Sequence, residues 1–171
     1  MPIKTPRELF VHMLSNLRQG TERTTKLVQE FTQNVQDPDI KEALEARIFV
    51  SQKILDTIDQ VFKITGEQPV KVSGRLLDTV AEEFRSELAE IQTPQVKNLY
   101  ILAKANQVLH LRIAEYRSLL AAADLSGHFA AGVLLETCLA DKLVFVERTD
   151  RLLRYLTGSK MAEKIQARAV A

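Results

Sequence analysis

The sequence predicts an all-α protein, a four-helix bundle of two antiparallel hairpins with a short helix in the long connection between them. The first observation is composition: helix-forming residues dominate, and the 171 residues include only 6 Gly and 5 Pro. The second is periodicity, because apolar residues recur at three- and four-residue spacing through long segments. The third is that capping and breaking residues separate those segments. A chain of this length buries roughly 70% of its unfolded surface, which suffices for one domain.

The first helix is expected to begin after Thr5 and to run to about Asn34. Thr5, Pro6 and Glu8 form a capping-box sequence, in which the threonine hydroxyl accepts from the Glu8 amide and the Glu8 side chain reaches back. Apolar residues then recur at helical spacing as far as Phe31. The sequence therefore predicts one long amphipathic helix here.

The second helix is expected to open at Asp37-Pro38 and to stop at Gly66, since aspartate caps and glycine ends helices. A shorter helix starts at Ser73-Gly74, and Thr93-Pro94 ends that region. This segment lies between the second and third long helices, so it forms part of their connection.

The last two long helices form a second pair. One is capped by Thr93-Pro94 and runs to about Asp124, and Gly127 separates it from the next. The final helix is expected over Phe129–Thr157, closed by Gly158.

The spacing of these helices predicts their arrangement. Short connections follow the first and third long helices, which makes two antiparallel hairpins, and a long crossover joins them. Each long helix measures on the order of 40 Å, so the crossover can span the bundle from end to end. This is the ferritin-like arrangement. The bundle is expected over residues 5–158, followed by a tail, 159–171, without a strong apolar pattern.

Composition and charge limit the function classes. The net charge is +1, from 23 basic and 22 acidic residues, which argues against nucleic acid as a partner. The single cysteine, Cys138, excludes an internal disulfide and a thiolate metal cluster. No apolar run is long enough to span a membrane, and the start of the chain lacks the apolar core of a signal peptide. We expect a cytoplasmic protein with no membrane contact and no cofactor.

Helical-wheel positions, at about 100° per residue, turn six polar side chains toward the bundle centre. The set has one carboxylate, two guanidinium groups and no imidazole, and so argues against a working di-metal centre, which needs anionic oxygen ligands. We expect Asp141 to pair with at least one arginine, with hydroxyls accepting further bonds. The alternative is that both arginines reach the surface separately. The expected buried polar cluster is Thr21, Arg47, Ser51, Arg112, Tyr116 and Asp141.

Three segments, Glu8–Ser15, Val61–Gly66 and Ile113–Leu120, resemble the YciE/YciF-type ferritin-like proteins, a stress-associated bacterial family. The likeness runs from about Thr5 to Thr157. It implies a ferritin-like bundle with a di-metal site, of which only Asp141 keeps a carboxylate here, so it also implies a degenerate site. The ligand positions that the resemblance implies are Thr21, Arg47, Val50, Leu109, Arg112 and Asp141.

These observations favour a non-catalytic ferritin-like protein that acts structurally or through association. Two alternatives stay open. One is an atypical metal-binding protein or oxidoreductase centred on Asp141, and the other is a small-anion binder that uses Arg47 and Arg112.

A second apolar surface predicts a homodimer. Phe49 lies opposite the core stripe of its helix, and Leu139 and Leu143 widen the apolar arc of the last helix. Exposed apolar patches of this kind mark protein interfaces, and two-fold dimers are the commonest assemblies.

Overall fold

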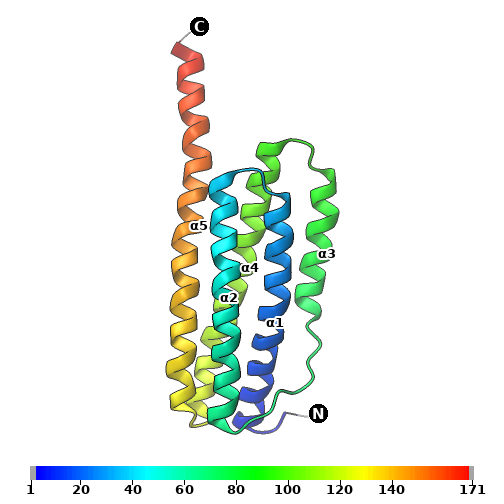
Figure 1. The fold of residues 1–171 in the computed structure, drawn as a ribbon, viewed down its shortest axis with the longest axis vertical. Coiled ribbons are helices and arrows are strands. Elements are labelled where there is room, and N and C mark those ends of the chain that lie inside the picture. Colours follow the sequence, from blue (N-terminus) through cyan, green and yellow to red (C-terminus); the bar gives the residue numbers. More distant parts are fainter. Residues whose placement is uncertain (1–2, 170–171) are drawn as a thin grey trace.

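The computed structural model describes the backbone of residues 3–169 and the side chains of residues 3–158 (Figure 1). This part of the chain folds into five helices and contains no strand, so the all-α prediction is confirmed. The helices are α1 (Pro6–Asn34), α2 (Pro38–Thr65), α3 (Arg75–Glu90), α4 (Pro94–Leu125) and α5 (Phe129–Ala169).

The four long helices form the bundle. α1 and α2 make one antiparallel hairpin, and α4 and α5 make the other (Figure 1). Both α1 and α5 pack against α2 and α4, so each long helix has two neighbours. The connection from α2 returns along the bundle, and its helix α3 lies outside, against α1 and α4 (Figure 1). The predicted pair of hairpins with a short helix in the crossover is confirmed.

Local hydrogen bonds explain where the first two helices begin and end. Thr5 Oγ1 accepts from the Glu8 amide at 3.2 Å, while Glu8 Oε2 accepts from the Thr5 amide at 2.9 Å, so the predicted capping box forms. The Asp37 carboxylate accepts from two amides in the first turn of α2. Gly66 ends α2 with φ of 71°, a left-handed conformation that glycine adopts at little cost.

The last helix differs from the prediction at its C-terminal end. The sequence predicts an end at Thr157, but α5 continues through Gly158 to Ala169. Gly158 does not adopt positive φ, and a glycine inside a helix costs about 1 kcal/mol without ending it. The division into a bundle, 5–158, and a tail, 159–171, stays a prediction, since the side chains of the tail lie outside the described residues.

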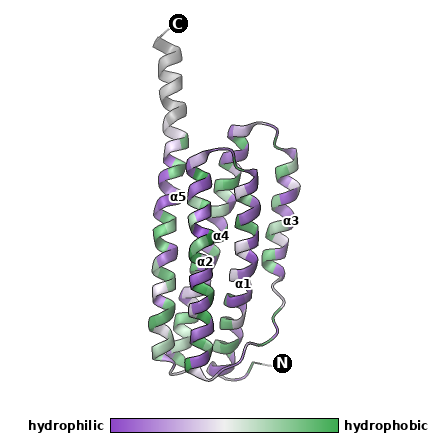
Figure 2. Cartoon of the chain, in the orientation of Figure 1, coloured by the Kyte–Doolittle hydropathy of each residue, from purple (hydrophilic) through white to green (hydrophobic). Residues whose placement is uncertain are grey.

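Two apolar clusters fill the bundle. One includes Phe10 and Leu119 and occupies the end at which α1 begins. The other includes Phe31 and Leu44 and occupies the opposite end. Every long helix carries both hydrophobic and hydrophilic residues (Figure 2), and none of the helices in the described residues is long and apolar enough to cross a membrane. Between the clusters the helices turn polar side chains inward.

Candidate functional site

A layer of polar side chains crosses the middle of the bundle between the two apolar clusters. Each of the four long helices contributes to it, and every member is more than nine-tenths buried. Ligands from four helices meet at this level in metal-binding bundles of this architecture. We call the set the cationic layer; it consists of Thr21, Thr24, Arg47, Ser51, Arg112, Tyr116 and Lys142.

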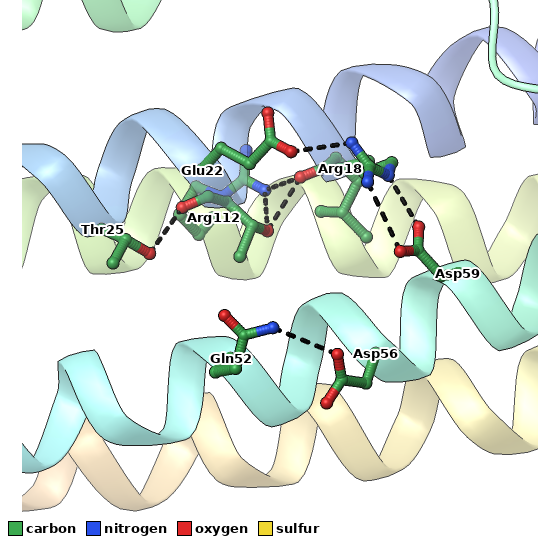
Figure 3. A network of polar contacts seen from close by, with 9 residues as sticks. Arg18, Glu22, Thr25, Gln52, Asp56, Asp59 and Arg112 are labelled. Atoms are coloured by element: carbon green, nitrogen blue, oxygen red, sulfur yellow. Dashed lines mark hydrogen bonds and ion pairs between the residues drawn. The ribbon is translucent and has the colours of Figure 1, made fainter.

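Arg112 reaches from α4 to α1. Its Nη2 donates to the Leu17 carbonyl at 2.6 Å and to Thr21 Oγ1 at 3.1 Å (Figure 3). Its Nη1 donates to Glu115, almost one turn along α4. Burial lowers the pKa of the guanidinium, and the Glu115 carboxylate opposes that effect. Arg112 is therefore a buried but paired cation that joins two helices.

Gly20 makes this position of Arg112 possible. A Cβ atom built on Gly20 would lie 2.8 Å from Cζ of Arg112 and closer still to Nη1. Any larger residue in α1 at this point would displace the guanidinium. Gly20 could not be predicted from the sequence, because a glycine in a helix interior carries no signal of what approaches it.

Arg47 is the second buried guanidinium, and it is only partly satisfied. Its side chain is 4% exposed, and Nη1 donates to the Ala105 carbonyl of α4 at 3.1 Å. Its Nη2 finds no hydrogen-bond partner within the described part of the chain. Burial, together with repulsion from Arg112, lowers the pKa of Arg47 to about 10. The group therefore remains charged at neutral pH without a carboxylate beside it.

Lys142 adds a third cation from α5. It is 3% exposed, and its ammonium forms neither a hydrogen bond nor an ion pair with the residues described. Burial, and then repulsion from Arg47 and Arg112, lower its pKa to about 7. Lys142 is not among the predicted inward residues, although it lies four residues after the core position Cys138 and therefore on the same helix face.

Asp141 does not take the predicted role. It is half-buried, and in the described part of the chain it pairs with neither arginine. Since successive residues of a helix point about 100° apart, it is the neighbouring Lys142 that faces the centre. The expected pair of Asp141 with an arginine is wrong: the carboxylate that pairs with Arg112 is Glu115, which the sequence analysis did not select.

The remaining predicted residues are buried or half-buried. Thr21 accepts from Arg112, as expected, but Ser51 donates to the Arg47 carbonyl of its own helix at 2.9 Å and does not contact a guanidinium. Tyr116 is fully buried, and its hydroxyl has no hydrogen-bond partner among the described residues. Burial and the nearby Cys138 thiol raise the pKa of Tyr116. Leu109 is fully buried, and Val50 packs half-buried against one apolar cluster.

Carboxylates on the α1–α2 face lie outside the layer. Glu22 pairs with Arg18 at 2.7 Å, and Arg18 also pairs with Asp59 of α2 at 2.7 Å (Figure 3). Both acidic side chains are almost half exposed. This network holds the two helices together at the surface and leaves the centre without its negative charge.

The layer thus combines three cationic groups with one carboxylate, Glu115, at its edge. Electrostatic repulsion couples Arg47 to Arg112 and Lys142 to both. Over the residues that the structure describes, no three His, Cys, Asp or Glu side chains form a group that could hold a metal ion. Chemically, such a layer offers hydrogen-bond donors and positive charge.

Comparison with known proteins places this geometry in context. Residues 5–165 match the family described as a domain of unknown function, DUF892. Protein YciF of Escherichia coli (strain K12) is 24% identical over 152 residues, covering 88% of this chain and 92% of that protein. The solved structure of YciF, described as a stress protein, has a TM-score of 0.85 at 21% identity and covers 91% of this chain and 99% of that one.

Two further solved structures are similar. YcfI from Rhodopseudomonas palustris, described as a candidate structural protein, is 27% identical with a TM-score of 0.83, covering 86% of this chain and 94% of that one. Ferritin-like diiron-carboxylate proteins from Bacillus anthracis str. Ames have a TM-score of 0.65 at 18% identity, covering 88% of this chain and 99% of that one. The ferritin-like fold predicted from the sequence is confirmed.

Proposed function

The chain belongs to the DUF892 family, and from this membership and the cationic layer we propose that it is a non-catalytic ferritin-like protein without a di-metal centre. We further propose a stress-related role, carried out structurally or through self-association. The descriptions of two relatives, one as a stress protein and one as a candidate structural protein, support this.

The observation that carries the proposal is the charge of the layer. A di-metal centre in this architecture uses about four acidic ligands from the four helices, because anionic oxygen offsets the cost of dehydrating the cations. Here Arg112 bonds to Leu17 and Thr21 in that region, with Arg47 and Lys142 buried nearby. Three cationic groups would repel a divalent ion, and Glu115 is already paired with Arg112. The residues present do not fit a di-metal cofactor.

Elemental analysis tests this proposal. The protein is purified without chelator from cells grown with added iron and manganese. We expect far less than one metal ion per chain. Near-stoichiometric iron or manganese would overturn the proposal and favour an atypical metal-binding protein or oxidoreductase around Asp141.

Self-association is proposed through the outer face of α5. Its exposed large apolar residues lie within an arc of about 120°, at 100° per residue. Around them the exposed charges change sign along the helix, from Glu136 to Arg154. A two-fold axis near Val144 would set Glu136 of each copy opposite Arg154 of the other, which favours a homodimer with antiparallel α5 helices. The apolar residues of this face are Phe129, Val133, Leu143, Val144 and Tyr155.

Sedimentation velocity tests the dimer. We expect a dimer at tens of micromolar and a monomer for Val144→Glu, because a buried unpaired carboxylate at the axis is costly. Val96→Glu, which changes an exposed valine of α4, is the matched control and should remain a dimer. A monomeric native protein would rule out this interface.

A further inference from the structure

The cationic layer has more hydrogen-bond donors than acceptors. Three of its members have a polar side-chain atom without a hydrogen-bond partner in the described residues: Thr24 Oγ1, Arg47 Nη2 and Tyr116 Oη. All three groups can donate, and the nearby Lys142 ammonium adds positive charge. Buried donors without acceptors are costly, and native proteins nearly always satisfy them.

Arg47 poses the largest part of this problem. Its pKa of about 10 keeps it charged at neutral pH, and a buried charge without a counter-charge is far more costly than an unpaired neutral group. A water molecule could accept from Nη2 but would bring no negative charge. Lys142, by contrast, can release its proton near neutral pH. Arg47 is therefore the group that needs a counter-charge whether or not Lys142 is protonated.

A narrow crevice between α2, α4 and α5 leads to this arginine. Arg47 lines it together with Ala105, Phe145, Arg148 and Thr149, and its interior measures about 10 Å³. A space of that size holds about one water-sized particle. Phosphate and sulfate are far too large for it, and a halide ion, which is slightly larger than a water molecule, would fit after a small outward shift of the lining side chains.

We propose that the cationic layer binds one small monovalent anion of the size of chloride, against the free Nη2 of Arg47 and with Lys142 as the second cation. This inference deepens the proposed function and rests on it, since a centre holding metal cations would leave no place for the anion. The ion would supply the counter-charge that the four helices do not provide.

Protonation of Lys142 makes binding depend on pH. The titratable and charged groups that act on Lys142 are Arg47 of α2, Arg112 of α4, and Cys138 and Asp141 of its own helix. At pH 6 the lysine is protonated and strengthens the site. At pH 9 it is neutral, so one of the buried positive charges that act on the anion is lost and the affinity falls.

Thermal unfolding in chloride tests the proposal. Chloride is titrated at pH 6 against gluconate at constant ionic strength. At ten times its dissociation constant, an ion that binds only the folded state should raise Tm by about 3 to 6 °C. We expect this rise in the native protein, a smaller rise at pH 9, and none in Arg47→Met. Lys53→Met, an exposed lysine of α2, is the control and should behave like the native protein.

The difference between Arg47→Met and Lys53→Met separates site binding from general salt effects. Equal responses of these two variants to chloride would overturn the proposal, and so would stabilisation by phosphate but not by chloride. Should Arg47→Met fail to fold, crystals of the native protein grown in sodium bromide provide the test. An anomalous peak within hydrogen-bond distance of Arg47 Nη2 is expected, and its absence at saturating bromide would refute the site.

The metal analysis of the same preparation distinguishes the two failures. If the protein contains no metal and its Tm does not respond to chloride, the anion site is overturned and the proposed function is unaffected. Protein with bound iron or manganese would overturn the proposed function itself.

Discussion

Gly20 offers the sharpest test of how the cationic layer is built. Replacing it with alanine adds one methyl group to α1. In an ordinary helix interior this change stabilises, because alanine has the better helix propensity by about 1 kcal/mol. Here the new Cβ would overlap the guanidinium of Arg112, with Cζ only 2.8 Å away. The sign of the effect therefore reports whether Arg112 lies where the structure has it.

The expected loss follows from the bonds of Arg112. The guanidinium donates to Leu17, Thr21 and Glu115, and a hydrogen bond of a charged group contributes about 1.5 to 3 kcal/mol. A displaced but still buried guanidinium would lose at least two of these bonds. After the gain in helix propensity, we expect Gly20→Ala to lower the free energy of unfolding by about 2 to 5 kcal/mol.

Urea unfolding followed by far-UV circular dichroism measures the effect. Gly132→Ala is the matched control, because its Cβ would meet only Asp124 Oδ1, at 3.9 Å, and it should stabilise the protein or leave it unchanged. In the Arg112→Met variant, Gly20→Ala should no longer lower the free energy of unfolding. A double-mutant cycle would then give a coupling energy between positions 20 and 112. If Gly20→Ala stabilises as Gly132→Ala does, Arg112 does not occupy this place and the reasoning fails.

Three further predictions concern charge and capping. Since the folded pKa of Lys142 is about 7 against an ordinary 10.5, the unfolded chain binds the extra proton and stability should rise with pH. The free energy of unfolding, measured with urea, should rise by up to about 1.4 kcal/mol per pH unit from pH 7 until the Cys138 thiol begins to ionise in the unfolded chain. This rise should be absent in Lys142→Met and retained in Lys53→Met. In chloride-free buffer Arg47→Met should leave stability unchanged or raise it by about 1 to 4 kcal/mol, since it removes an unpaired buried charge; a clear loss in the same assay would mean that the guanidinium has a counter-charge. Thr5→Ala should lower the free energy of unfolding by about 1 kcal/mol through loss of the cap, and no change would show that the capping box contributes nothing.

The fold could be predicted because local chemistry encodes most of it. The capping box at Thr5 and the left-handed Gly66 act within a few residues, and the apolar spacing of each helix states which face is buried. The end of α5 was missed for the same local reason. Glycine is a weak terminator unless it takes positive φ, and nothing in the neighbouring sequence shows that Gly158 does not.

The candidate site could be predicted only in part. Helical periodicity identified Arg47 and Arg112 as inward-facing, since their directions depend on their own helices. It placed Asp141 at the centre in place of Lys142, because one residue shifts a side chain by about 100° and the stripe of α5 is wide. Partners were harder still. The pair of Arg112 with Glu115 is local, because the two residues lie three apart on α4. The bonds of Arg112 to Leu17 and Thr21 depend on the approach of α4 to α1, which no single helix encodes.

Under the proposed function, the cationic layer cannot become a metal site one substitution at a time. Thr21 Oγ1 lies 3.1 Å from Arg112 Nη2, so a glutamate at position 21 would pair with this guanidinium and not with a metal ion. Removing Arg112 first would leave a centre with Arg47 and Lys142 and without new carboxylates. Because a di-metal centre needs about four acidic ligands at once, each single step either forms an ion pair or leaves unpaired cations. The paired state of Arg112, fixed by the missing side chain at Gly20, thus works against metal binding.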